Sequence, residues 1–112
     1  MARSQKKTDL LRGTLDLLIL RILELRPLHG IAISDRIHQV TRGTFAVQAG
    51  SLFPALHRLE QEGWLAGEWA VTDQKRRVKA YTLTPAGRRQ LSTEKRQWER
   101  IVTAVSQLLE TS

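Results

Sequence analysis

The last quarter of the chain carries an apolar repeat that is too long for the rest of so short a protein to cover. Thr84 is a good helix N-cap, and Pro85 opens a helical pattern that runs to about Leu109. A helix of about 25 residues is roughly 40 Å long. Its side chains alternate in steps of four and three, and the seam consists of Leu91, Glu94, Trp98, Ile101, Val105 and Leu108. We expect the apolar members of this seam to contact a second copy of the chain.

Three shorter helices are predicted before the long one. Apolar residues recur at helical spacing over residues 15–25 and again over about 31–41. A third helix begins between Gln48 and Ser51 and ends at Gly63, which favours a left-handed cap.

A β-hairpin is predicted between the third helix and the long one. Residues 64–71 and 78–83 are rich in aromatic and β-branched side chains, and they flank the polar turn 72–77. We expect Trp64 and Trp69 to pack this hairpin onto the helices.

The order of these elements predicts a mainly α fold with a small β-hairpin. Compact short helices followed by a two-stranded ribbon are typical of a winged helix-turn-helix, whose later helix enters the DNA major groove. We divide the chain into a flexible basic arm at residues 1–8, a DNA-binding winged helix-turn-helix at 9–83 and a C-terminal dimerisation helix at 84–112.

The surplus of basic residues falls where such a fold meets DNA. The formal net charge is +7, and phosphate backbones attract this kind of surplus. The candidate DNA contacts on and beside the third helix are Gln48, Ser51, Phe53, Pro54, His57 and Arg58, and those in the hairpin are Lys75, Arg76, Arg77 and Lys79. For Arg58 a phosphate or base contact is favoured over an ion pair with Glu62, whereas Ser51 either contacts DNA or caps its own helix.

The sequence lacks the residues that several classes of protein function require. The chain has no cysteine, which excludes disulfides, thiolate metal sites and cysteine nucleophiles. It offers no catalytic pair of carboxylates and no phosphate-binding glycine loop, and its three histidines form no site. We expect no enzyme activity, metal or cofactor. The longest apolar stretch is interrupted by charges and is followed by no cleavage site, so we expect no membrane span and a cytoplasmic protein.

Two other functions use the same fold. In a winged-helix adaptor for protein contacts the hairpin charges would be dispensable, and DNA affinity would vary little with salt. An RNA-binding accessory protein would prefer RNA to duplex DNA.

The sequence also resembles the PadR family of bacterial transcriptional regulators. The matching stretches are Leu11–Asp16, His29–Gly30, Gly50–Glu60, Arg76–Arg77 and Tyr81–Gly87. The resemblance implies a homodimeric repressor that binds an inverted-repeat operator and pairs through its C-terminal helix, with small aromatic or planar molecules as effectors.

Two points of this resemblance bear on the candidate sites. Trp98 would either pack in the dimer seam or line the effector cavity. Phe53 and Ile31 stand where the family usually has tyrosine, so a phosphate contact through a hydroxyl at Phe53 is lost.

Overall fold

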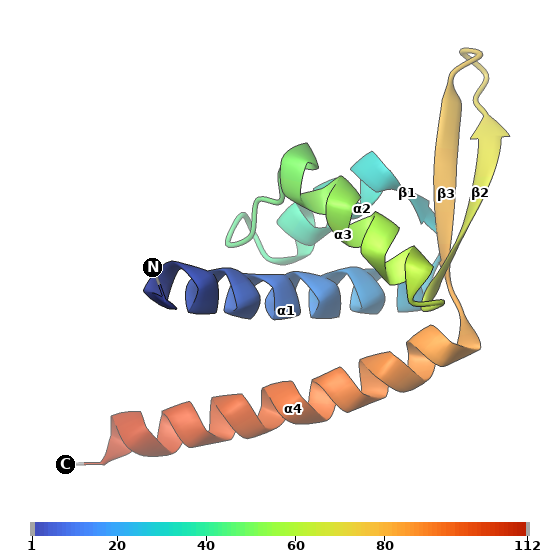
Figure 1. Ribbon diagram of the computed structural model, residues 1–112. Helices are drawn as coiled ribbons and strands as arrows, with labels where there is room; N and C mark the ends of the chain where they lie inside the picture. Colours follow the sequence, from blue (N-terminus) through green and yellow to red (C-terminus); the bar gives the residue numbers. More distant parts are fainter. Residues whose placement is uncertain (1, 112) are drawn as a thin grey trace.

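The computed structural model describes residues 2–111, with side chains from residue 13 onward (Figure 1). Along this part of the chain the elements are α1 (Ala2–Leu25), β1 (Leu28–His29), α2 (Gly30–Val40), α3 (Ala49–Gln61), β2 (Leu65–Val71), β3 (Arg77–Leu83) and α4 (Pro85–Glu110). The predicted fold class, with its short helices, hairpin and long terminal helix, is confirmed.

Two parts of the backbone differ from the prediction. Residues 1–8 were predicted to form an arm outside the fold, but α1 begins at Ala2, and Met1 lies outside the described residues. A third strand, β1, pairs antiparallel with β3 and gives the sheet order β1-β3-β2. Its two residues are too few to produce an alternating pattern in the sequence.

The core lies where α1, α2 and α3 meet the base of the hairpin. α1 runs beneath α2 and α3, and the hairpin stands at the far end and projects beyond them (Figure 1). Each fully buried aliphatic side chain contributes about 1.5–3 kcal/mol by leaving water. The most completely buried ones are Ile19, Leu20, Ile33, Ile37, Leu52, Leu56, Leu59 and Leu91.

A glycine ends α3 and directs the chain into the hairpin. Gly63 has a φ of +81°, a conformation that side chains with a Cβ rarely adopt. Its amide donates to the Glu60 carbonyl at 3.0 Å, and the Trp64 amide donates to the Leu59 carbonyl at 3.1 Å. This Schellman arrangement satisfies the last carbonyls of α3 and sets the start of β2.

The start of α4 is fixed against the base of the hairpin. The Thr84 hydroxyl accepts a hydrogen bond from the Gly87 amide at 3.0 Å and donates one to the Gly63 carbonyl at 2.7 Å, which confirms Thr84 as the N-cap. A Cβ at Gly87 would lie 2.1 Å from the Trp64 carbonyl oxygen, so α4 begins in direct contact with the backbone before β2.

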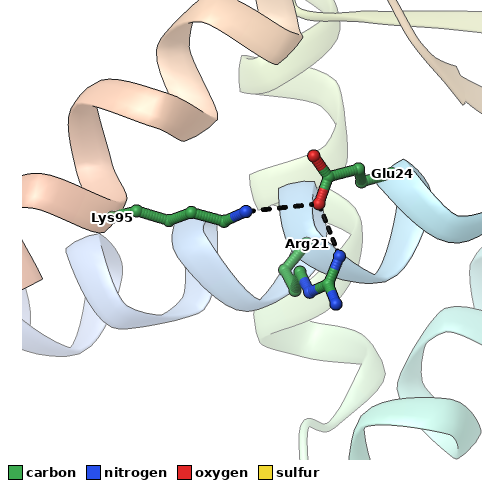
Figure 2. Close-up of polar contacts among 3 residues, drawn as sticks. All are labelled: Arg21, Glu24 and Lys95. Atoms are coloured by element: carbon green, nitrogen blue, oxygen red, sulfur yellow. Dashed lines mark hydrogen bonds and ion pairs between the residues drawn. The ribbon is translucent and has the colours of Figure 1, made fainter.

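α4 stays close to α1 only over its first half. Lys95 donates to the Glu24 carboxylate at 3.4 Å, and Arg21 donates to the same oxygen from the neighbouring turn of α1 (Figure 2). The two helices diverge towards the C-terminus of α4 (Figure 1), and residues 96–110 are exposed.

One member of the predicted dimer seam belongs instead to the core of its own chain. Leu91 is 1% exposed in the single chain, so it has no surface left to offer a partner. The prediction that Leu91 contacts a second copy is therefore wrong, because the first turns of α4 are covered by the chain itself.

Candidate nucleic-acid interface

The predicted recognition helix presents one side to the core and the other to solvent. α3 buries Leu52, Ala55, Leu56 and Leu59. Five of the six candidate contacts on and beside α3 are exposed, namely Gln48, Ser51, Phe53, Pro54 and His57. Gln48 occupies the N-cap position. Ser51 thus lies inside the first turn, and the alternative in which it caps the helix is wrong.

Phe53 has one exposed edge and one contact with α2. Its ring is 43% exposed, and a Cβ at Gly30 would lie 2.7 Å from its Cε1 atom. The ring therefore rests on the backbone at the start of α2. This contact explains why a glycine follows His29, and it holds the outer face of α3 in place.

Arg58 lies at the contact between α3 and α1, where its side chain is 33% exposed. Its guanidinium donates two hydrogen bonds to the Asp16 carboxylate on α1, at 2.7 and 2.8 Å, and Asp16 is buried. The hydrogen bond to Asp16 raises the pKa of Arg58. The sequence favoured a DNA contact for Arg58, with an ion pair to Glu62 as the alternative. Neither describes this geometry, because both terminal nitrogens of the guanidinium already bond to Asp16. We assign Arg58 to the packing of α3 on α1.

The hairpin turn presents three cations to solvent. Thr72 closes the turn, since its amide donates to the Arg76 carbonyl at 2.9 Å and its hydroxyl accepts from the Arg76 amide at 3.2 Å. Lys75 adopts a left-handed backbone conformation with a φ of +61°. Lys75, Arg76 and Arg77 are all exposed, as a wing that meets phosphates requires.

Lys79 is engaged within the chain. Its Nζ donates to the Glu60 carboxylate on α3 at 2.7 Å, and this hydrogen bond raises the pKa of Lys79. Gly67 on β2 lies diagonally across from Lys79, and a Cβ there would lie 2.3 Å from Lys79 Cε and 2.9 Å from Glu60 Oε2. Gly67 thus leaves room for an ion pair that joins the hairpin to α3.

Trp69 is exposed, contrary to the prediction that it packs the hairpin onto the helices. The ring is 60% exposed and lies under the guanidinium carbon of Arg77, 4.6 Å from its centroid. Trp64, by contrast, is partly buried against the core as expected.

A small pocket lies between α1 and α4. It has a volume of about 160 Å³ and is lined by Gly13, Thr14, Leu17, Glu94, Gln97, Trp98 and Ile101. Burial raises the pKa of Glu94, against the opposing effect of a hydrogen bond from Gln90. Trp98 is 41% exposed, so its ring forms part of the wall and also remains open to solvent.

Among residues 2–111, no three histidine, cysteine or acidic side chains converge in a way that could hold a metal ion. In the same part of the chain, no helix combines the length and apolar character that crossing a membrane requires.

The sequence profile of the PadR-like family of transcriptional regulators matches residues 19–93. This stretch covers more than half of the chain and contains α2, α3 and the whole hairpin. The chain belongs to the PadR family.

Known PadR-like proteins and other regulators resemble the chain in sequence and fold. The transcriptional regulator Rv3488 of Mycobacterium tuberculosis is 39% identical over 67 residues, which span 60% of this chain and 62% of that protein. A PadR family regulator from Eggerthella lenta superposes with a TM-score of 0.77 at 33% identity, covering 99% of this chain and 95% of the other. A transcriptional regulator from Clostridium thermocellum superposes with a TM-score of 0.83 at 25% identity, covering 91% and 99%.

Membership of the PadR family makes the chain a DNA-binding transcriptional regulator of the winged-helix class and not an enzyme. The family profile ends at residue 93, so the exposed second half of α4 lies beyond it. Sequence reasoning missed two side chains on that half, since Val102 and Leu109 are exposed alongside Trp98, Ile101, Val105 and Leu108. Both residues lie three or four positions from members of the predicted seam, and this helical spacing could have identified them from the sequence.

Proposed function

We propose that this PadR protein is a cytoplasmic, homodimeric repressor that binds an inverted-repeat operator and releases it when a small aromatic effector binds. In this proposal the outer face of α3 enters the major groove and the β2–β3 hairpin lies along the neighbouring backbone.

The observation that carries the DNA-binding mode is the position of the exposed cations that no carboxylate of the described residues engages. Lys75, Arg76 and Arg77 are exposed at the tip of a hairpin that stands beside the exposed face of α3 (Figure 1). Arg58 and Lys79 are engaged by carboxylates within the chain, so we leave them out of the proposed contacts. They fix α3 against α1 and the hairpin against α3, which sets the relative positions of the two DNA-binding elements.

The second half of α4 supports the proposed dimer. Its exposed apolar side chains share one face of the helix, and they are Trp98, Ile101, Val102, Val105, Leu108 and Leu109. A stripe of this size on an otherwise polar helix needs a partner. A second copy of the same helix offers a matching stripe, and a two-fold pair would present two recognition helices to the two halves of a palindrome.

The pocket beside Trp98 supports the proposed effector. Its wall combines an indole with the aliphatic side chains of Leu17 and Ile101, which suits a flat apolar ring. Because the pocket lies between α1 and α4, a ligand there would bear on the junction between the DNA-binding unit and the dimer helix.

The test is selection of bound sequences from random duplex DNA, followed by titrations of the selected duplex at several salt concentrations. We expect a palindromic motif. Replacing Arg76 and Arg77 by alanine should flatten the slope of log affinity against log salt by about 0.9 for each lost phosphate contact. The matched control is Arg89→Ala, which removes an exposed cation from α4, the helix that starts at the base of the hairpin and leads away from its tip (Figure 1).

The outcomes separate this proposal from the other two functions. If the double variant keeps the wild-type slope, the hairpin is not a DNA-binding wing and the adaptor function gains support. If the wild type prefers RNA to the selected duplex, the RNA-binding function replaces the proposal.

A further inference from the structure

An exposed tryptophan on the hairpin has no partner in the core. Alternate residues of β2 face the helices, and in this set Leu65 is buried while Trp69 and Val71 are exposed. The hairpin extends beyond the helices (Figure 1). The helices therefore do not cover the outer half of the hairpin face that points towards them. This uncovered part of the inner face carries the Trp69 indole together with Val71.

The surroundings of this indole are cationic. Arg77 lies over one ring face at 4.6 Å, and Lys79 lies 5.6 Å from the ring centroid. Glu60 on α3 holds Lys79 through the ion pair described above. Glu60, Lys79, Trp69 and Arg77 thus form a continuous row from the recognition helix out along the wing, which we call the wing row.

We infer that Trp69 is itself a DNA contact of the wing, packing against a deoxyribose of the backbone beside the phosphate that Arg77 binds. The inference rests on the proposed function, because it requires the hairpin to lie on DNA. The wing would then contact DNA through an apolar side chain as well as through its cations.

The position and chemistry of the wing row favour the sugar-phosphate backbone of duplex DNA. The row lies on the side of the hairpin that faces α3, as the Glu60–Lys79 pair shows. If α3 occupies a major groove, the backbone that borders this groove passes between α3 and the hairpin tip. A deoxyribose is an apolar ring flanked by phosphates, and the wing row offers an indole flanked by cations. The stacked indole also limits the positions of the Arg77 guanidinium, so less freedom is lost when it meets a phosphate.

The test follows Trp69 directly in the full-length chain. The protein is labelled with 5-fluorotryptophan, and the fluorine resonance of Trp69 is assigned by its loss in Trp69→Phe. The probe is a short duplex of mixed sequence at low salt, because a sugar contact does not depend on sequence. We expect the Trp69 resonance to move on titration with this duplex while that of Trp64, packed against the core, stays in place.

The matched variants separate the indole from the charges. Trp69→Ala should weaken binding about three- to tenfold, as expected for one exposed aromatic contact and its stacked cation. Its salt slope should remain that of the wild type, whereas Arg77→Ala should lower the slope by about 0.9. Trp69→Phe keeps an aromatic ring in the hairpin and should lose less affinity than Trp69→Ala. An unchanged thermal midpoint in both variants shows that the hairpin is intact.

Each contrary result has its own meaning. If Arg76→Ala weakens binding while the Trp69 resonance stays fixed and Trp69→Ala binds as the wild type does, the inference is wrong and the proposed function stands. If the wild type does not bind the duplex, both fail. A Trp69 resonance that moves with protein concentration in the absence of DNA would place the indole between copies of the chain and overturn the inference.

Discussion

Arg58 on α3 holds Asp16 on α1 through two hydrogen bonds, of 2.7 and 2.8 Å, between its terminal nitrogens and both carboxylate oxygens. The pair joins residues 42 positions apart in the sequence. Asp16 is buried within the apolar face of α1, so its charge depends on this one guanidinium for compensation. The orientation of α3 therefore depends on an ion pair beneath it.

Arg58→Ala should destabilise the fold. The substitution leaves the buried carboxylate of Asp16 without its partner, and such a group costs about 1–3 kcal/mol. Urea unfolding at one fixed protein concentration measures the loss, since the stability of a dimer varies with concentration. A variant as stable as the wild type would mean that solvent replaces the guanidinium without cost.

A double variant separates packing from DNA contact at the same residue. Replacing Asp16 by leucine and Arg58 by methionine removes both charges and should restore most of the stability, as apolar replacements of buried ion pairs often do. If Arg58 only positions α3, DNA affinity should return with stability. Restored stability without restored affinity would instead make Arg58 a DNA contact, as the sequence alone suggested.

The backbone was largely predictable because its signals are local. The four-three alternation after Pro85, the apolar stripe of α3 and the two flanks of the hairpin each lie within one element. Residues 2–8 were not predicted as helix because they carry no apolar period, and nothing described in the structure explains their helical backbone.

Side-chain partners were less predictable because they depend on distant parts of the chain. A search at helical spacing pairs Arg58 with Glu62, whereas its partner Asp16 comes from another helix. Leu91 belongs to the apolar repeat of α4. Such a repeat shows that a side chain is buried, but not whether its own chain or a partner chain buries it. Trp69 was expected to pack onto the helices, but the composition of the hairpin could not show that the strands extend beyond the helices.

Stability should depend on pH through Glu94. One of its carboxylate oxygens is buried without a hydrogen-bond partner among the described residues, and burial raises its pKa. The nearby charge of Asp16 acts in the same direction and that of Arg58 opposes it. A carboxyl group with a raised pKa in the folded state contributes its stability fully below its unfolded value of 4.5 and loses it as the pH rises through the folded pKa.

Glu94→Gln should therefore gain thermal stability relative to the wild type at pH 7 and lose this advantage near pH 4. The difference between the two melting temperatures, measured across this range, is the readout. Glu99→Gln removes an exposed carboxylate from the next turn of α4 and should show no such trend. A Glu94→Gln difference that does not vary with pH would show that this carboxyl group titrates equally in the folded and unfolded chains.

Trp98 belongs to the stripe and also lines the pocket, and we expect it to report effector binding while the other members of the stripe hold the dimer. Its ring lines the pocket between α1 and α4 and is partly exposed. Trp98→Ala should remain dimeric and bind DNA, but it should lose the fluorescence quenching and the DNA release that planar aromatic compounds cause in the wild type. If the ring instead packs as dimer core, truncation should cost on the order of 3–5 kcal/mol, and the variant will dissociate or unfold.

The exposed stripe on α4 predicts a dimer that a charge on the correct face disrupts. Val105 and Leu108 lie within the stripe, whereas Thr103 is exposed on the opposite side of the same helix. Replacing Val105 and Leu108 by glutamate buries charge in the proposed interface and should shift the protein from dimer to monomer in sedimentation velocity at micromolar concentration. Thr103→Glu adds the same side chain to the same stretch of helix and should leave the dimer intact. A monomeric wild type would contradict the proposed dimer, and equal dissociation of the Thr103→Glu control would move the interface away from this face of α4.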